Sequence, residues 1–363
     1  MSAPLRRAVI DASRISANVE LLRGLAPATH TLVVVKANGY GHGAVTAARA
    51  ALAGGADWLG VADITEATEL RAAGITAPVL AWLHAPDEDF RAATESGITI
   101  GASSIAHLEA LAQCDNPSVH LKIDTGLGRN GAGRDDIPGF IARAAELHHA
   151  GRIRVEGLMS HCSGTSREAD LSQAEEFEAV LADLRERGID PEFRHLAASA
   201  AALDHPSLRH SMVRFGIAAY GLAPADHLRN TGVRPAMRLE TNVILTKKLR
   251  AGDGVSYNHL WRATEGTTVA LVPVGYADGI PRAATGHARV AINGERFPVV
   301  GRIAMDQMVV DVGDTRVSVG DVVSVWGDPV DGTPHPDEWA DWAGTIGYEI
   351  VTRLGHRVSR IPV

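Results

Sequence analysis

A lysine followed by a glycine-rich string is the first candidate for chemistry. Lys36 comes directly after the apolar run Thr31–Val35, and three of the next seven residues, Ala37–Gly43, are glycines. Burial at the end of a strand penalises the charged ammonium, which lowers the pKa of a lysine and makes its amine a nucleophile. Tyr40 follows four residues on, where its hydroxyl could hold a phosphate. A lone lysine after a strand is more often a surface residue, but the whole string favours a reactive amine.

A second glycine-rich string, Lys122–Gly131, contains a G-x-G-x-x-G frame at Gly126–Gly131 after an apolar run. Such a frame occurs in dinucleotide-binding loops. Arg129 inside the frame, the mid-chain position and an early proline, Pro138, weaken that interpretation. An arginine that binds a carboxylate or a phenolate explains the string better. The dinucleotide site remains a minor alternative.

Further polar residues stand at or near the ends of other apolar runs: Lys122, His161, Ser199 and Arg214. Any one of them could be a satisfied core or surface residue. If the runs are strands of one barrel, their carboxyl ends meet at one face, where active sites gather. We therefore expect these residues to share a mouth with Lys36. Tyr257, Tyr276 and Tyr348, three of the five tyrosines, lie in short motifs of the last third.

The elements that must position these residues alternate over the first 220 residues. Eight apolar runs are predicted strands: Leu32–Val35, Trp58–Ala62, Pro78–Leu83, Gly97–Gly101, Val119–Ile123, Val155–Ser160, Arg194–Ala197 and Val213–Ala219. Apolar residues at helical spacing predict helices such as Ala44–Ala53, Ile64–Ala73, Ser104–Ala112 and Leu171–Arg187. Eight alternations predict an α/β fold, an eight-stranded (β/α) barrel. An open doubly wound sheet is the alternative.

The pattern changes after about Pro224. From Leu239 onward it consists of short strands with turn signals and almost no helical period, which predicts a C-terminal, mostly β domain. Asn293-Gly294 within Ala288–Val300 is a strong hairpin signal. Further strands are predicted at Thr268–Val274, Met308–Val312 and Asp321–Trp326.

Size and composition set further expectations. A chain of 363 residues exceeds the usual size of one core and predicts two domains. A formal net charge of -8 disfavours a nucleic-acid partner. No apolar stretch approaches the ~18 residues of a membrane-spanning helix, and no secretory signal is visible after Met1. Two distant cysteines, Cys114 and Cys162, lack metal-like spacing and suit a cytoplasmic protein with no bound metal.

Four strings together resemble the alanine racemases, and the likeness extends along essentially the whole chain: Lys36–Gly43, Lys122–Arg129, Met212–Gly221 and Gly275–Gly279. The resemblance implies a barrel at 11–230 carrying pyridoxal 5'-phosphate, and a β domain made of 1–10 and 231–363. It also implies a cytoplasmic homodimer whose subunits share each site, with no membrane partner. Such an enzyme interconverts L-alanine and D-alanine, a peptidoglycan precursor, by a two-base mechanism.

By position, the resemblance assigns the Schiff-base lysine to Lys36 and the opposite acid/base, given by the other subunit, to Tyr257. The residues that match the family's cofactor-binding set, besides Lys36, are Tyr40, His161, Ser199, Arg214, Gly216, Ile217 and Tyr348. The residues that match its substrate side and entrance are Arg129, Tyr276, Met305 and Asp306. Lys122 matches a lysine that is often carbamylated, whose new negative charge would hold Arg129.

The chain departs from the family pattern in several places, at Ala198, Asn258, His259, Ala304 and Ser166. Ala198 replaces an asparagine, and Ser166 stands where an acidic residue is expected. These departures leave open a racemase of serine or of a broader set of amino acids. A decarboxylase of the same fold and a non-catalytic pyridoxal-phosphate carrier are more distant alternatives.

Overall fold

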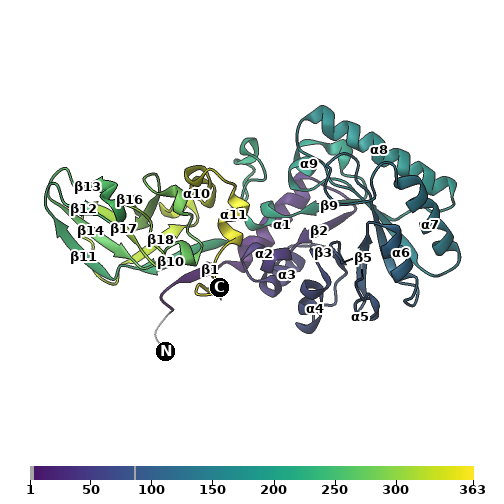
Figure 1. Ribbon diagram of the computed structural model, residues 1–363, viewed down its shortest axis with the longest axis horizontal. Coiled ribbons are helices and arrows are strands. Elements are labelled where there is room, and N and C mark those ends of the chain that lie inside the picture. The colour runs from purple at the N-terminus through teal and green to yellow at the C-terminus, as the bar shows by residue number, and fades with distance from the viewer. Residues whose placement is uncertain (1–3, 86) are drawn as a thin grey trace.

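The computed structural model describes residues 4–85 and 87–363 and consists of two parts that lie side by side along its longest axis (Figure 1). One part is a β/α barrel, and the other is a β domain that also contains the N-terminal strand. Residues 1–3 of the predicted segment 1–10 lie outside the described residues.

Eight parallel strands form the barrel, and the predicted barrel is confirmed. They run in the order β8-β7-β6-β5-β4-β3-β2-β9, with the bounds β2 (His30–Val34), β3 (Trp58–Val61), β4 (Val79–Ala81), β5 (Ile98–Ala102), β6 (Ser118–Lys122), β7 (Arg154–Met159), β8 (Phe193–His195) and β9 (Met212–Phe215). Most of their residues are buried, as expected for parallel strands covered on both faces. The barrel closes between β8 and β9 through a parallel bridge from Ala198 to Arg214, which excludes the open doubly wound sheet.

Helices cover the outside of the barrel: α1 (Ala12–Leu25), α3 (Ala44–Ala53), α4 (Ile64–Ala72), α5 (Arg91–Glu95), α6 (Ile105–Leu111), α7 (Ile137–His149), α8 (Arg167–Glu186) and α9 (Ser199–Asp204). The four helices located from the sequence are confirmed within a few residues at each end. Helix α3 shows why, because Ala44, Ala47, Ala48 and Ala51 recur at helical spacing and are all buried. Among the described residues, no helix is long and apolar enough to cross a membrane.

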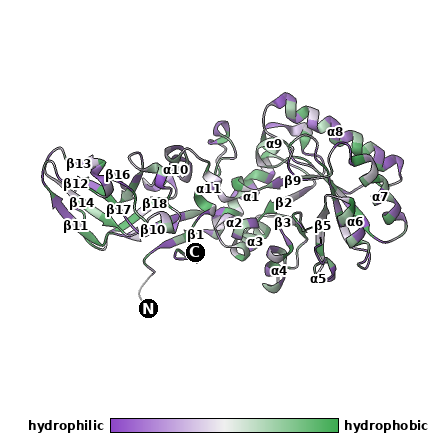
Figure 2. Cartoon of the chain, viewed as in Figure 1, coloured by the Kyte–Doolittle hydropathy of each residue, from purple (hydrophilic) through white to green (hydrophobic). Residues whose placement is uncertain are grey.

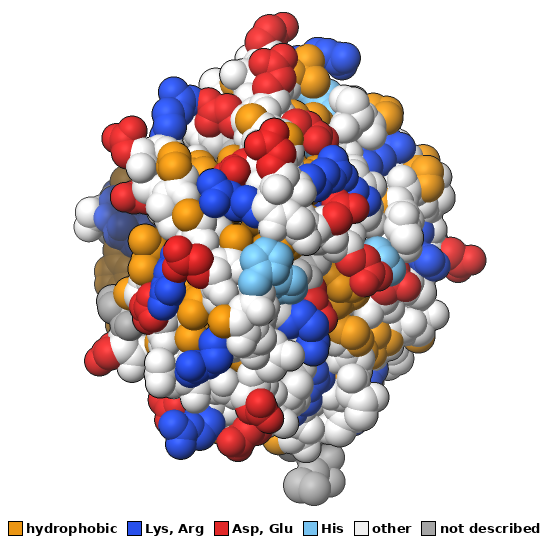
Figure 3. Space-filling view, turned by 90° about the vertical axis from the view of Figure 1, so that its right-hand side faces the viewer, with side chains coloured by type: hydrophobic (Ala, Val, Ile, Leu, Met, Phe, Trp, Pro, Cys, Tyr) orange, Lys and Arg blue, Asp and Glu red, His pale blue; other side chains and the backbone are white. Residues whose placement is uncertain are grey.

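The interior of the barrel is more hydrophobic than its surface, as expected for a barrel covered by amphipathic helices. Figure 2 shows hydrophobic residues along the barrel strands and a mixture of polar and apolar residues along α7 and α8. Figure 3 shows acidic and basic side chains interspersed over the end of the molecule at which these two helices lie.

One predicted strand runs on into a different element. The expected strand Val213–Ala219 ends at Phe215, and Ile217–Tyr220 forms a buried 3-10 turn, η2, after a break at Gly216. A continuous apolar run does not distinguish a buried strand from a buried helical turn. The correction matters because it places Gly216 and Ile217 at the carboxyl end of β9, on the face where the other strands end.

The β domain is built on a nine-stranded sheet in the order β11-β14-β17-β16-β15-β18-β10-β1-β19. Its strands are β1 (Arg7–Ile10), β10 (Met237–Asn242), β11 (Leu245–Leu249), β14 (Thr267–Val272), β15 (Arg289–Ile292), β16 (Glu295–Val300), β17 (Met308–Gly313), β18 (Val322–Trp326) and β19 (Ser359–Pro362). The short strands β12 (Gly254–Val255) and β13 (Trp261–Arg262) pair separately. Strand β1 pairs with both β10 and β19, so both ends of the chain belong to this sheet.

The predicted hairpin at Asn293-Gly294 is confirmed. Strands β15 and β16 pair from Ile292 to Glu295, which leaves two turn residues with φ of 52° and 84°. Positive φ at both central residues is the geometry that asparagine and glycine favour.

The predicted mostly β domain is confirmed, but it also contains two short helices that the sequence pattern did not indicate. Helices α10 (Pro336–Ala343) and α11 (Gly347–Thr352) lie beside the barrel junction (Figure 1). Helix α10 has a reciprocal cap between His335 and Glu338, a proline at its first position and Gly344 after its end. These start and stop signals are present in the sequence, but eight residues are too few to establish a helical period.

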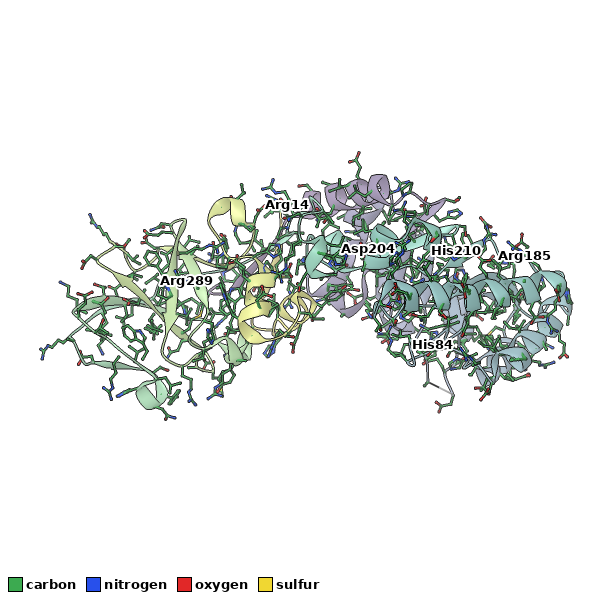
Figure 4. All side chains as sticks on the ribbon, turned by 90° about the horizontal axis from the view of Figure 1, so that it is seen from above. Arg14, His84, Arg185, Asp204, His210 and Arg289 are labelled. Atoms are coloured by element: carbon green, nitrogen blue, oxygen red, sulfur yellow. The ribbon has the colours of Figure 1, made fainter. Side chains whose placement is uncertain are left out.

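The two parts are joined by polar contacts at the junction, where Figure 4 shows Arg14. Arg14 on α1 and Arg234 in the linker both pair with Asp328 of the β domain. The amide of Asn18 donates to the carbonyls of Ala219 and Arg234. The linker therefore lies against both the barrel and the β domain.

Gly221, at the end of η2, provides a test of this junction. Its φ is +83°, and a Cβ there would overlap the carbonyl of Arg234. We expect Gly221→Ala to lower the free energy of unfolding by about 3 kcal/mol or more, because left-handed strain and overpacking add. Gly286 is the matched control, since its φ is +86° with open space around it; Gly286→Ala should cost only about 1–2 kcal/mol. Urea denaturation curves compare the two, and equal losses would contradict the close packing of the linker.

Candidate active site

A cavity of about 980 Å³ opens at the carboxyl ends of the barrel strands. Among its lining residues are many of those singled out from the sequence: Lys36, Tyr40, Lys122, Arg129, His161, Ser199, Arg214, Gly216, Ile217 and Tyr348. They come from separate strand ends and from α11 of the β domain. The structure thus brings them together at one mouth, while Tyr257, Tyr276, Met305 and Asp306 do not line it.

Lys36 opens a turn with unusual backbone geometry. The segment α2 (Lys36–Tyr40) contains Ala37, Asn38 and Gly39 at φ of 53°, 54° and 61°, and Tyr40 follows at 50°. Four consecutive residues therefore lie in the left-handed region, which costs about 1–2 kcal/mol for each residue other than glycine. Strain of this kind persists where the surroundings over-determine it and clusters at functional sites. The turn is what carries Tyr40 back towards the cavity.

Glu66 of α4 is one of the groups that hold this turn. Its Oε1 accepts the backbone N–H of Ala37 at 2.7 Å, and its Oε2 accepts that of Ala62 at 2.8 Å. Both carboxylate oxygens are therefore used on backbone donors at the ends of β2 and β3. The sequence offers only a helix-start signal here, since Asp63 caps α4 by accepting the N–H of Glu66.

The remaining turn contacts are made within the string itself. Asn38 Oδ1 accepts the N–H of Ala44 at 2.9 Å, which ties the turn to the start of α3. His42 Nδ1 lies 3.1 Å from the carbonyl of Gly39 and 2.9 Å from that of Tyr40, so this nitrogen donates. Burial lowers the pKa of His42 to about 4, and the ring stays neutral at pH 7. Hydrogen bonds within the glycine-rich string and to the start of α3 thus stabilise the loop, together with Glu66.

Cationic side chains gather along the lining of the cavity, and burial acts on its two lysines; they are Lys36, Lys122, Arg129, Arg167 and Arg214. The pKa of Lys36 is lowered by burial and by Arg129, with Glu66 opposing the shift. The pKa of Lys122 falls to about 7, first through burial and then through Arg214, Arg129 and Lys36. Both amines are therefore more readily neutral than an exposed lysine, and a neutral amine can act as a nucleophile or a base. The excess of positive charge suits an anionic ligand.

Arg214 differs from the two lysines, because hydrogen-bond acceptors surround its guanidinium N–H groups. Nη1 donates to the carbonyl of His195 at 2.6 Å, and Nη2 donates to those of Ser160 at 2.7 Å and Leu196 at 3.0 Å. Ring nitrogens of His195 and His161 also accept, each at 3.1 Å. Burial lowers the pKa of Arg214 to about 10, so the guanidinium stays charged at neutral pH.

His161 is neutral in this arrangement. Burial comes first among the causes that lower its pKa to about 3, followed by the neighbouring charge of Arg214. Because an arginine only donates, His161 Nδ1 must carry no proton, and the proton of the neutral ring lies on Nε2. The same argument applies to His195 Nδ1, which lies 3.1 Å from Nη1 of Arg214. Nothing in the sequence distinguishes His195 beyond its place in β8.

A second group of residues forms a small polar cradle at another side of the cavity. Ser199 Oγ accepts the N–H of Gly216 at 3.0 Å. A Cβ at Gly216 would lie 2.6 Å from the Tyr40 hydroxyl, so glycine at this position lets the hydroxyl approach the backbone. Burial raises the pKa of Tyr40, and it raises the pKa of Tyr348 to about 12, so both phenols keep their protons and can donate.

The G-x-G-x-x-G frame does not form a phosphate loop. Asp124 Oδ1 accepts the N–H groups of Gly126 at 2.9 Å and Gly128 at 3.1 Å, and Oδ2 accepts that of Arg129 at 2.7 Å. The backbone donors that would bind a pyrophosphate are therefore already occupied by a carboxylate. This excludes the dinucleotide alternative and identifies Asp124 as the residue that shapes the loop presenting Arg129.

The remaining predicted site residues lie on the β domain, away from this chain's own cavity. Tyr257 is 69% exposed, and Tyr276 and Met305 are exposed as well. The carboxylate of Asp306 is bound to Arg357 at 2.7 Å. The loop around Tyr257 is strained, because three non-glycine neighbours have positive φ: Ser256, Asn258 and His259. An exposed aromatic side chain on a strained loop is the pattern of a functional surface.

Two departures from the family pattern also have a place in the structure. Ala198 lines the cavity beside Ser199. Ser166 accepts the N–H of Ala169 and so caps α8, where an acidic residue was expected. Asp170 is buried and accepts the N–H of Gly164, so an acid does lie close to the expected place.

Family models match almost the whole chain. The model for the alanine racemase N-terminal domain matches residues 10–224, and the model for the C-terminal domain matches residues 236–362. An alanine racemase of Thermobifida fusca is 45% identical over 360 residues, covering 97% of this chain and 96% of the relative. An alanine racemase of Mycobacterium avium is 46% identical over 366 residues, covering 98% and 94%.

Solved structures agree with these matches. The alanine racemase of D-cycloserine-producing Streptomyces lavendulae has a TM-score of 0.97 and 41% identity, covering 100% of this chain and 98% of that one. The alanine racemase of Bacillus anthracis, described with bound L-Ala-P, has a TM-score of 0.90 and 34% identity, covering 100% and 96%. Both parts of the chain are matched, so neither the decarboxylase nor the barrel-only carrier is supported.

The contacts of Glu66 give a prediction. In Glu66→Gln the amide group must face either Ala37 or Ala62, so one backbone N–H meets a donor and loses its acceptor. We expect the free energy of unfolding to fall by about 0.5–1.5 kcal/mol, the net contribution of one hydrogen bond, because neither backbone donor is fully buried. Glu69→Gln on the exposed face of the same helix is the matched control and should stay within about 0.5 kcal/mol of wild type. Equal denaturation midpoints for the two variants would show that Glu66 does not hold the turn.

Proposed function

The chain belongs to the alanine racemase family, and from that premise we propose that it interconverts L-alanine and D-alanine with pyridoxal 5'-phosphate as cofactor. Two bases are proposed, Lys36 of one subunit and Tyr257 of its partner in a homodimer. The observation that carries the proposal is the cavity itself, in which the Lys36 amine, with its lowered pKa, shares the lining with four other Lys and Arg side chains.

The lining of the cavity fits the cofactor at three points. The hydroxyls of Tyr40 and Ser199, which both lie close to the backbone of Gly216, suit the phosphate. Arg214 suits the pyridine nitrogen. Protein acceptors bind its Nη1 and Nη2, whereas none of the contacts described above involves Nε, so the Nε–H could donate to the ring nitrogen. Lys36 would hold the cofactor covalently through Nζ. When bound, pyridoxal phosphate supplies an electron-accepting ring that acidifies the substrate Cα–H.

Arg214 and His161 set the electrostatics at the ring nitrogen. A guanidinium keeps its proton at working pH, so Arg214 can donate a hydrogen bond but does not transfer a proton. His161 is neutral and orients Nη2 of Arg214 from the side. Arg214 would therefore hold the ring nitrogen by a hydrogen bond without giving it a proton, and a cofactor held in this way would supply a moderate electron acceptor.

Lys36 is proposed as the base on one face of the substrate. Burial together with Arg129 favours the neutral form of its Nζ when this amine is free. A neutral amine at this place can take the proton from Cα or return it. The substrate carboxylate is proposed to lie against Arg129, which Asp124 presents at the mouth.

Lys122 is proposed to be carbamylated. Its pKa of about 7 leaves much of the amine neutral at neutral pH, and a neutral amine adds to carbon dioxide and loses one proton to give a carbamate. The modification would exchange a buried cation for an anion beside Arg129 and Arg214. That exchange removes the repulsion among the cations and fixes the orientation of Arg129.

Tyr257 is proposed as the base on the other face, in the cavity of the partner subunit. It is exposed in its own chain and does not line its own cavity. Tyr276, Met305 and Asp306 lie on the same side of the β domain and are proposed to form the entrance with it. Binding of L-Ala-P by the relative from Bacillus anthracis supports an alanine-sized ligand.

The cofactor site is tested by borohydride. We expect purified protein incubated with pyridoxal phosphate and then reduced to carry the cofactor on the peptide that contains Lys36, as seen by mass spectrometry. Lys36→Ala should lose both the label and the conversion of L-alanine to D-alanine. Lys248→Ala, which removes an exposed lysine of β11, should retain both. Label at another lysine in the wild-type protein would contradict the assignment.

The shared site is tested by complementation. Lys36→Ala and Tyr257→Phe are each expected to be nearly inactive. In a mixed dimer, a shared arrangement puts both substitutions in one site and leaves the other site intact. Co-expression should therefore restore activity to roughly a quarter of wild type, because about half of the dimers are mixed and each has one intact site. No recovery in isolated mixed dimers would place both bases on one chain.

A further inference from the structure

The barrel interior behind Arg214 contains a second buried histidine with no role in the site described above. His120 lies on β6 and is fully buried. Its Nδ1 lies 2.9 Å from Nε2 of His195, which in turn contacts Arg214. Arg214, His195 and His120 thus form a chain of side chains that leads from the cavity into the core.

The donors in this chain can be assigned from one end. An arginine only donates, so His195 Nδ1, at 3.1 Å from Nη1, must be without a proton. A neutral His195 then carries its proton on Nε2 and donates it to His120 Nδ1. The proton of a neutral His120 lies on Nε2. Every hydrogen bond therefore runs in one direction, away from the cavity.

Both rings are neutral, as this direction requires. Burial and the charge of Arg214 lower the pKa of His120 to about 3. Burial, His120 and Arg214 hold the pKa of His195 well below its ordinary value. A doubly protonated His195 would point an N–H at the guanidinium, so the arrangement has no place for a second charge.

The core around His120 is built for its ring. Gly157 on the neighbouring strand β7 leaves the space that the ring needs, since a Cβ there would overlap the ring. The ladder between β6 and β7 shifts register between Val119 and His120. Phe193 stacks on the ring at 5.5 Å between centroids, and Trp58 packs at 5.4 Å. The orientation of the ring is therefore determined by residues of three other strands.

Stability alone does not explain a histidine at this position. His120 Nε2 is buried and has no hydrogen-bond partner among the residues that the structure describes. An unsatisfied buried donor costs about 1–3 kcal/mol, whereas an apolar ring of similar shape would carry no such cost. What the histidine provides and an apolar ring does not is the acceptor at Nδ1.

We propose that His120 is a positioning residue for the reaction, which accepts the Nε2 proton of His195 and so keeps His195 Nδ1 free to hold Arg214. The inference rests on the proposed function in one respect, that Arg214 faces the cofactor. Without the acceptor, His195 can carry its proton on Nδ1, and one N–H of Arg214 then loses its partner. Arg214 is thereby released from one of the contacts that aim it into the cavity.

Two substitutions separate this role from packing. His120→Phe keeps a ring between Phe193 and Trp58 but removes the acceptor, and His120→Asn places an amide oxygen near the position of Nδ1. We expect His120→Phe to lower kcat about 10-fold or more, the equivalent of an unsatisfied donor, with KM changed much less. His120→Asn should recover most of the lost kcat. Equal kcat values for the two variants would overturn the proposal.

A readout without cofactor tests the same chain of hydrogen bonds. In apoprotein labelled with 15N-histidine, the ring nitrogens of His195, assigned with His195→Gln, should show an unprotonated Nδ1 and a protonated Nε2 at neutral pH. In His120→Phe the Nε2 form should lose population, and in His120→Asn it should be retained. Proton on Nδ1 in the wild-type protein would overturn the proposal even if a variant failed to fold. Wild-type protein that does not racemise alanine would instead overturn the proposed function.

Discussion

Positive charge withdrawn from water at the carboxyl ends of the barrel strands is the constraint on which this molecule depends. Burial of a cation is costly unless the charge is lost or its donors are satisfied. The cavity uses both solutions. The pKa values of Lys36 and Lys122 are lowered, which favours their neutral forms. Arg214 stays charged, because carbonyls and neutral histidines accept its N–H groups. The two lysines can therefore react as neutral amines, whereas Arg214 remains a cation that can orient a ligand.

The same constraint explains the polar residues that surround the cavity. Neutral His161 and His195 accept from Arg214 without adding charge. Both carboxylate oxygens of Glu66 accept backbone N–H groups, which holds the loop after Lys36 in its left-handed conformation. The carboxylate therefore does not take the place of an anionic ligand beside the cations. The carboxylate of Asp124 likewise accepts backbone N–H groups of the glycine loop that presents Arg129. The acids near the mouth thus serve the backbone and leave the cations for the ligand.

The β domain is tied to the barrel through its strands and its linker, yet the aromatic residue proposed as a base faces outward. Strand β1 joins the N-terminus to the nine-stranded sheet, and Asp328 joins that sheet to Arg14 and Arg234. These contacts fix the domain while Tyr257 remains exposed on a strained loop. A rigid scaffold that projects one reactive side chain suits a site completed by a second subunit.

The sequence by itself determined the barrel and singled out ten of the predicted site residues that line the cavity. Buried parallel strands are apolar on both faces, so their runs are visible in the chain, and strand ends such as Lys36 follow from them. It did not determine the end of the run Val213–Ala219, because an apolar run does not distinguish a strand from a buried turn. It also did not show that Glu66 holds Ala37, nor that His195 holds Arg214. Only the tertiary structure decided these contacts, because they join residues that are distant in the chain and meet only when the barrel closes.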